Sequence, residues 1–232
     1  MTQYMILRGA GEALNDNLPT RFLRPLLKHG DTVTQIDYPA SIGPVTPAGG
    51  KMGSMDASRK AGKAALAAAV ERTANIPVLV TYSLGGYAGA DYLEALAVGE
   101  YPDHQIGGAI EIASPRARVA NGREGLARAH RRYPDIPVCE VRNYWDIICN
   151  TPTNSPLMKM TGLVAIASGG VADGFNVMAW IMGEFLRQAA LPSQSDIRLI
   201  QGYANGIDHA AAYLDNPVFR AHVSEWITAH RF

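Results

Sequence analysis

Short apolar runs alternate along the chain with segments in which apolar residues recur every three or four positions. The short runs predict buried strands, and the longer period predicts amphipathic helices. Runs such as 108–112, Gly-Ala-Ile-Glu-Ile, are too continuous for half-exposed strands and are typical of a parallel sheet covered on both faces. We therefore expect strands at Tyr4–Arg8, Thr32–Tyr38, Pro77–Tyr82, Ile106–Ala113, Pro137–Val141 and Ile197–Tyr203.

Between these strands, helical patterns occupy Asn17–Lys28, Met55–Thr73, Gly85–Ala97 and Ala210–Ala229. Strands that alternate with helices indicate the α/β class, with a mostly parallel central sheet flanked by helices. The length suits one domain covering residues 1–232. Residues 153–192 interrupt the alternation with extra helical pattern, which we interpret as a helical insertion or lid before the last strand.

Charge and hydropathy exclude several classes of protein. Lys plus Arg and Asp plus Glu number 21 each, and the resulting zero net charge argues against a nucleic-acid binder. The chain opens on a strand-like run with no basic region and no long apolar region, so we expect no signal peptide. The most apolar later stretch, 163–186, is broken by glycines and charged residues, so we expect no stable membrane insertion. The two cysteines, Cys139 and Cys149, could pair with each other or remain as reduced buried thiols.

The clearest chemical signal lies where the third predicted strand ends. Tyr82 closes the strand, Ser83 follows, and two glycines open a helix. In a G-x-S-x-G nucleophile elbow, a tight strand-to-helix turn lifts the serine hydroxyl above the sheet. Gly85 supplies the second glycine, where a side chain would collide with a strand, but Thr81 replaces the first. The alternative is a serine that merely caps the helix starting at Leu84.

A serine nucleophile needs a histidine base that is held by a carboxylate. In α/β-hydrolases the acid and then the histidine follow the serine along the chain. His209 lies between the last predicted strand and the last helix, so it is the candidate base, the alternative being an ordinary surface histidine. Asp146 follows the fifth strand between Trp145 and Ile147 and is the candidate acid, with Asp208 in reserve.

Such a site also needs two backbone N–H groups that face the developing oxyanion. Leu84, the residue after the nucleophile, supplies one of them. Gly9 and Gly11 would let the backbone at Ala10 approach the substrate, so Ala10 is the second candidate unless this is a simple glycine-rich turn. This chemistry requires no metal and no other cofactor.

Several apolar side chains are candidates for contact with the substrate. Tyr82 and Trp145 adjoin the predicted nucleophile and acid. Others lie in the predicted insertion, where ordinary helix packing is an equally good interpretation: Leu157, Val164, Ile166, Phe175, Met178 and Trp180.

These motifs together resemble a known family. Residues 8–12, Arg-Gly-Ala-Gly-Glu, resemble the R-G-[ST]-x-E turn of cutinases, and Thr-Tyr-Ser83-Leu-Gly resembles their G-Y-S-Q-G elbow. Residues 146–149, Asp-Ile-Ile-Cys, resemble the cutinase G-D-x-[VI]-C segment. The stretch 36–40, the helix after Ser54 and the insertion are similar to mycobacteriophage lysin B proteins.

The resemblance implies a cutinase-like α/β-hydrolase that uses Ser83, Asp146 and His209 on a lipid ester of the cell envelope. Lysin B proteins cleave mycolic acid from arabinogalactan during host lysis. If phage-encoded, the protein would be made in the host cytoplasm and would act on the envelope. The sequence departs from the family at four positions: Thr81 for glycine, Leu84 for glutamine, Ala10 for a hydroxyl residue and Trp145 for glycine. The changes at Thr81 and Leu84 keep open a virion or envelope-binding protein on a degenerate scaffold. An acyltransferase with the same triad is the other alternative.

Overall fold

The computed structural model describes residues 1–43, 45–129, 132–159 and 193–232. Its main sheet has five strands in the order β2-β1-β3-β4-β6, and every neighbouring pair is parallel. This confirms the predicted α/β class. The strands are β1 (Gln3–Leu7), β2 (Thr32–Gln35), β3 (Val78–Tyr82), β4 (Gly108–Ile112) and β6 (Val138–Val141). They correspond to the first five predicted strands, with β1 shifted by one residue and the other four shorter than predicted.

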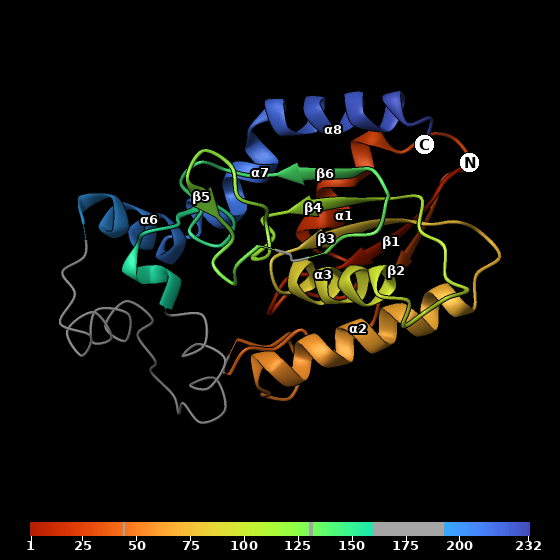
Figure 1. The fold of residues 1–232 in the computed structure, drawn as a ribbon, viewed down its shortest axis with the longest axis horizontal. Helices are drawn as coiled ribbons and strands as arrows, with labels where there is room; N and C mark the ends of the chain where they lie inside the picture. Colours follow the sequence, from red (N-terminus) through yellow and green to blue (C-terminus); the bar gives the residue numbers. More distant parts are fainter. Residues whose placement is uncertain (44, 130–131, 160–192) are drawn as a thin grey trace.

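Helices cover both faces of this sheet (Figure 1). On one side lie α2 (Met55–Glu71) and α3 (Leu84–Ala97). On the other side lie α1 (Leu18–Leu23), which continues into the 3-10 turn η1 (Arg24–Leu26), and the C-terminal helix α8 (Pro217–Ala229). The alternation of side chains along each strand supplies both cores. On β1, for example, Tyr4 and Ile6 pack with α1 and α8, whereas Met5 and Leu7 pack with α2 and α3.

The sixth predicted strand, Ile197–Tyr203, is wrong, because these residues belong to helix α6 (Gln194–Ala204). Ser193 and Asp196 form a reciprocal capping box, in which each side chain accepts a hydrogen bond from the backbone N–H of the other. Leu199 and Ile200 follow at helical spacing and are buried. The capping box stabilises a helix start, and it outweighs the strand propensity of the isoleucines.

The predicted final helix, Ala210–Ala229, is also not continuous. A π-helical turn η3 (Ile207–Ala211) leads into the short helix α7 (Ala212–Asp215), and α8 begins afresh at Pro217. Proline lacks the N–H that an uninterrupted helix would need, but it fits the first position of a new one. The Asn216 side chain caps this new start by accepting from Val218 N–H.

A smaller layer lies beyond the carboxyl ends of the strands (Figure 1). It consists of α6, the antiparallel pair β5 (Arg123–Glu124) and β7 (Thr151–Pro152), and the 3-10 turn η2 (Pro156–Lys159). Most of the predicted insertion, residues 160–192, lies outside the described residues. Among those that are described, no helix has the length and apolar character needed to cross a membrane. Cys139 and Cys149 are both buried free thiols.

Candidate active site

Ser83 occupies a strained turn between β3 and α3. Its backbone has φ 52° and ψ −116°, a conformation that L-residues rarely adopt and that is typical of a nucleophile elbow. The serine side chain makes no capping hydrogen bond to α3, so the alternative of a simple helix cap is wrong. The turn instead presents the hydroxyl at the carboxyl end of the sheet.

Gly85 allows the elbow to pack against the end of β1. A Cβ atom at this position would lie 2.3 Å from the Leu7 carbonyl oxygen and 2.5 Å from that of Arg8, which is closer than such atoms can approach. Thr81 replaces the first glycine of the elbow motif, and its larger side chain fits because helix α3 has a glycine opposite it. The Thr81 methyl group would lie 2.8 Å from a Cβ at Gly89, so the missing side chain of Gly89 makes room for the threonine.

The structure brings Ser83, His209 and Asp146 into one hydrogen-bonded chain. His209 Nε2 lies 2.8 Å from Ser83 Oγ, and His209 Nδ1 lies 3.0 and 2.9 Å from the two carboxylate oxygens of Asp146. Asp146 is fully buried, whereas the His209 side chain keeps 12% of its surface exposed. His209 does not lie on a loop after a strand, as the sequence predicted, because the π-turn η3 carries it.

The other candidate acid, Asp208, has a different partner. Its carboxylate accepts a hydrogen bond from Arg198 on α6. Its backbone oxygen accepts from the Asn143 side chain at 2.9 Å. Asp208 therefore helps to fasten the turn that carries His209, while Asp146 is the carboxylate that contacts the imidazole.

The glycine-rich turn at residues 8–12 is stabilised by hydrogen bonds of the charged side chains at its two ends, Arg8 and Glu12. Glu12 accepts hydrogen bonds from the N–H groups of Gly9 and Leu18, each at 2.7 Å. Burial raises the pKa of Glu12, and these two backbone hydrogen bonds act in the opposite direction. At the other end, the buried Arg8 guanidinium donates to the carbonyl oxygens of Tyr38 and Glu12. The turn is thus a braced structure rather than a free glycine-rich loop.

The two candidate oxyanion donors, Ala10 and Leu84, belong to residues of one apolar cluster. Ala10 packs against the apolar cluster that contains Leu84, together with Tyr38, Ala40 and Met55. Leu84 is the first residue of α3, and the first N–H groups of a helix have no partner within the helix. The positive end of the helix dipole points at the same place. This arrangement suits the stabilisation of a negative charge beside Ser83.

Aromatic rings surround the imidazole. The ring centroids of Tyr82 and Tyr203 each lie 5.2 Å from that of His209, the Tyr82 ring being stacked on it. Tyr82 is 95% buried, so most of its surface contacts protein. Tyr203 was not predicted to lie at the site, because its segment was assigned to a strand. Tyr213, whose hydroxyl contacts Asp146, was not predicted there either. The spacing of Tyr213 four residues after His209 could have indicated a shared helical face.

The remaining candidates for substrate contact divide into three groups. Trp145 is 37% exposed and packs edge-on against the exposed Tyr144. Leu157 is buried among Ile147, Leu199 and Ile200, so it packs in the protein interior. Val164, Ile166, Phe175, Met178 and Trp180 lie outside the described residues. In the described part of the chain, no three His, Cys, Asp or Glu side chains gather so that they could hold a metal ion.

The fold is similar to that of lysin B from Mycobacteriophage D29, with a TM-score of 0.58, 15% sequence identity and coverage of 98% of each chain. Weaker similarity extends to the catalytic core domain of acetyl xylan esterase from Trichoderma reesei (TM-score 0.48, 20% identity, 72% of this chain and 96% of that one). A cutinase-like protein from Cryptococcus sp. follows (TM-score 0.44, 17% identity, 74% and 97%). No protein-family model matches the sequence, and no curated protein matches it significantly. The chain therefore shares the parallel α/β fold of lysin B from Mycobacteriophage D29.

Proposed function

We propose that this protein is a carboxylic ester hydrolase with Ser83 as its nucleophile. The observation that carries the proposal is the continuous hydrogen-bonded chain from Ser83 Oγ through the His209 ring to the buried Asp146 carboxylate. A carboxylate can only accept hydrogen bonds, so His209 Nδ1 carries a proton and Nε2 is free to accept one from the serine. This is the arrangement that a general base requires.

The reaction follows from these atoms. His209 Nε2 takes the hydroxyl proton as Ser83 Oγ attacks the ester carbonyl, and the backbone N–H groups of Ala10 and Leu84 stabilise the oxyanion. The C–O bond to the alcohol then breaks, and the imidazolium gives its proton to the leaving alcohol. Water, deprotonated by the same imidazole, then attacks the acyl carbon. The bond to Ser83 Oγ breaks, the imidazolium returns its proton to that oxygen, and the acid is released. Asp146 stabilises the imidazolium in both halves of the cycle.

A fluorophosphonate probe together with a p-nitrophenyl ester tests this proposal. The wild-type protein is expected to be labelled at Ser83 and to hydrolyse the ester, while Ser83→Ala loses the label and about a thousandfold or more in kcat/KM. Ser114→Ala is the matched control, because this buried serine also follows a strand end but binds the Arg116 N–H. A wild-type protein that is neither labelled nor active would contradict the proposal and favour a binding protein on a hydrolase scaffold.

For the substrate, we propose a lipid ester of the mycobacterial cell envelope, with the mycolic acid–arabinogalactan linkage as the specific candidate. The lysin B-like fold over 98% of the chain supports this choice, as does the resemblance of the turn at 8–12 and of the acid segment. Trp145, exposed beside the acid, is a candidate contact for the bulky substrate.

Incubation with purified mycolyl-arabinogalactan provides the test, with mass spectrometry of the released lipids. Free mycolic acid from the wild-type protein, absent with Ser83→Ala, is the expected result. Transfer of the acyl group to added trehalose would identify an acyltransferase instead. Turnover of p-nitrophenyl esters without any release from the envelope polymer would retain the esterase and overturn this substrate.

A further inference from the structure

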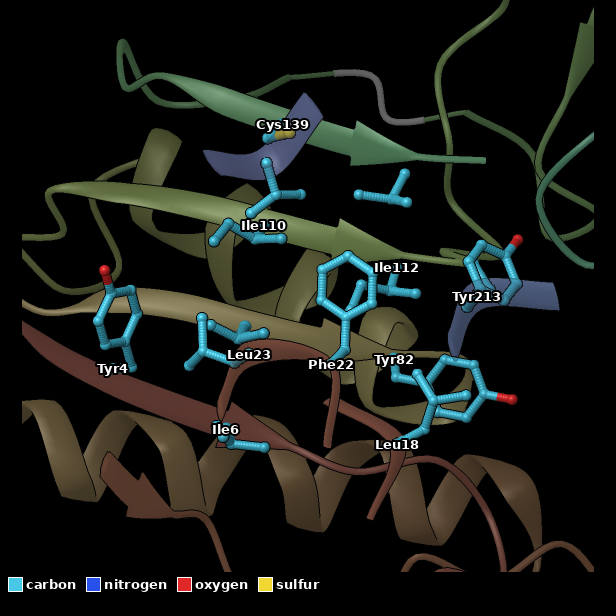
Figure 2. Close-up of a cluster of buried hydrophobic side chains, with 14 of the residues drawn as sticks. Tyr4, Ile6, Leu18, Phe22, Leu23, Tyr82, Ile110, Ile112, Cys139 and Tyr213 are labelled. Carbon is cyan, nitrogen blue, oxygen red and sulfur yellow. The ribbon is translucent and has the colours of Figure 1, made fainter. Parts of the chain in front are cut away.

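A second side chain from the C-terminal segment reaches the candidate acid. Tyr213 on α7 is fully buried, and its hydroxyl oxygen lies 2.7 Å from Asp146 Oδ2. The same oxygen lies 3.0 Å from the Asn143 N–H and 3.3 Å from the Cys149 thiol. Figure 2 shows Tyr213 and Tyr82 at the same end of the apolar core, toward the arrowhead ends of the strands.

The direction of these hydrogen bonds is fixed by chemistry. The Asn143 N–H can only donate, so the Tyr213 oxygen accepts from it. The Asp146 carboxylate can only accept, so the single hydroxyl proton of Tyr213 points at Oδ2. Burial raises the pKa of Tyr213 well above its usual range, which keeps that proton on the phenol.

With this hydroxyl, both oxygens of Asp146 have donors besides the imidazole. The Ile148 N–H donates to Oδ1 at 2.9 Å, and Tyr213 donates to Oδ2 at 2.7 Å. The Cys149 thiol, a weaker donor, also lies 3.6 Å from Oδ2. His209 Nδ1 lies nearly equidistant from both oxygens. These donors hold the carboxylate so that its open edge faces the ring, and the Tyr213 hydroxyl is the shortest of the three contacts.

We propose that Tyr213 is a positioning residue, which orients Asp146 toward His209 and moderates the negative charge that the imidazole experiences. The inference rests on the proposed esterase function. Tyr213 follows His209 by four residues, so one short segment brings both the imidazole and the phenol to the same carboxylate. Asn143 completes the link, because its backbone contacts Tyr213 while its side chain binds the Asp208 backbone beside His209.

Tyr213→Phe removes only the hydroxyl and is the primary test, with p-nitrophenyl ester turnover measured across pH. We expect kcat to fall about tenfold with KM unchanged, since a hydrogen bond to a charged group is of this size. Without the donor, the carboxylate stabilises the imidazolium more strongly, so the acidic limb of the kcat/KM profile should move to higher pH. Tyr92→Phe is the matched control, because Tyr92 is equally buried and loses one hydrogen bond, to His104.

A second variant covers the case in which Tyr213→Phe fails to fold. Incorporation of 3,5-difluorotyrosine at position 213 preserves the shape and makes the phenol a stronger donor, so the acidic limb should move to lower pH. Unchanged profiles in the variants that fold, or an equal loss in Tyr92→Phe, would overturn the inference. A wild-type protein without turnover or fluorophosphonate labelling would instead remove the proposed function itself.

Discussion

The hydroxyl of Tyr82 donates a hydrogen bond to the backbone oxygen of His209 over 2.7 Å, while its ring stacks on the imidazole. The residue just before the candidate nucleophile thus holds the candidate base, which comes from 126 positions after Ser83 in the sequence. Gly9 leaves room for this contact, since a Cβ there would lie 2.7 Å from the Tyr82 ring. Tyr82 therefore fixes the spacing between the elbow and the histidine.

Tyr82→Phe should lower kcat by up to about tenfold, because it removes one neutral hydrogen bond that holds the His209 backbone. Tyr82→Leu should lower it further, since the ring that stacks on the imidazole is then lost as well. Steady-state ester hydrolysis measures both effects. Tyr101→Phe, which alters a ring stacked on His104 instead, should retain wild-type kinetics. Equal rates for Tyr82→Leu and wild type would show that Tyr82 has no role in positioning.

Gly85→Ala should destabilise the protein and abolish probe labelling. The new methyl group would lie 2.3 Å from the Leu7 carbonyl oxygen and 2.5 Å from that of Arg8. These are backbone atoms, which cannot move away as a flexible side chain could. We expect a loss of about 2 kcal/mol or more in the free energy of unfolding, as for other overpacked sites.

Thermal and denaturant unfolding provide the measurement for Gly85→Ala. Gly107→Ala is the control, because its nearest atom is the movable Phe232 ring at 3.2 Å. A Gly85→Ala protein that keeps wild-type stability and labelling would show that the elbow does not depend on this close approach.

A buried carboxyl in strand β4, between β3 and β6, predicts a distinct pH dependence of stability. Burial raises the pKa of Glu111 to about 8, and the negative charge of the nearby Glu140 raises it further. A hydrogen bond from the Tyr133 hydroxyl and the positive charges of Arg118 and Arg142 act in the opposite direction. The folded state therefore holds a proton that the unfolded chain releases near its usual pKa. The contribution of Glu111 to stability is complete at low pH and is lost as pH rises from about 4.5 toward 8.

Glu111→Gln keeps an oxygen for the Tyr133 hydroxyl but has no proton to lose. It should be more stable than the wild-type protein at pH 8, by on the order of a few kcal/mol, and similar to it at pH 4.5. Urea unfolding at both pH values measures this difference. Glu100→Gln, at an exposed ion pair with Lys63, should show no such gain. Parallel stability curves for Glu111→Gln and wild type would contradict the prediction.

The strands of the sheet and the turn at Ser83 could be predicted from the sequence, because both depend on local patterns of residues. Continuous apolar runs identified strands such as β3 and β4, and the S-x-G-G pattern identified a turn whose strain the structure displays at Ser83. Asp146 and His209 could be placed by their order along the chain. Their assembly with Ser83 into one hydrogen-bonded chain could not be predicted in the same way, since three distant segments must converge to form it.

The predicted strand at Ile197–Tyr203 was wrong because the residues flanking this apolar run favour a helix. Residues 197–203 alone suit a strand, but the Ser193 and Asp196 pair three residues apart favours a helix start. The break at Asn216–Pro217 was visible in principle, because proline seldom continues a helix. The π-turn at His209 had no local signature, since its extra residue is fixed by tertiary contacts with Asp146 and Asn143.

The π-turn at Ile207–Ala211 makes the protein sensitive to insertions and deletions in this segment. The Ala211 N–H bonds to the Gly206 oxygen, five residues earlier, so the turn holds one residue more than an α-helix would. Removing a single alanine from 210–212 would rotate every later side chain by about 100° relative to the histidine. The phenol that now faces the acid would point elsewhere, although no residue with its own chemistry had been changed. Deletions here should therefore be harder to accommodate than substitutions.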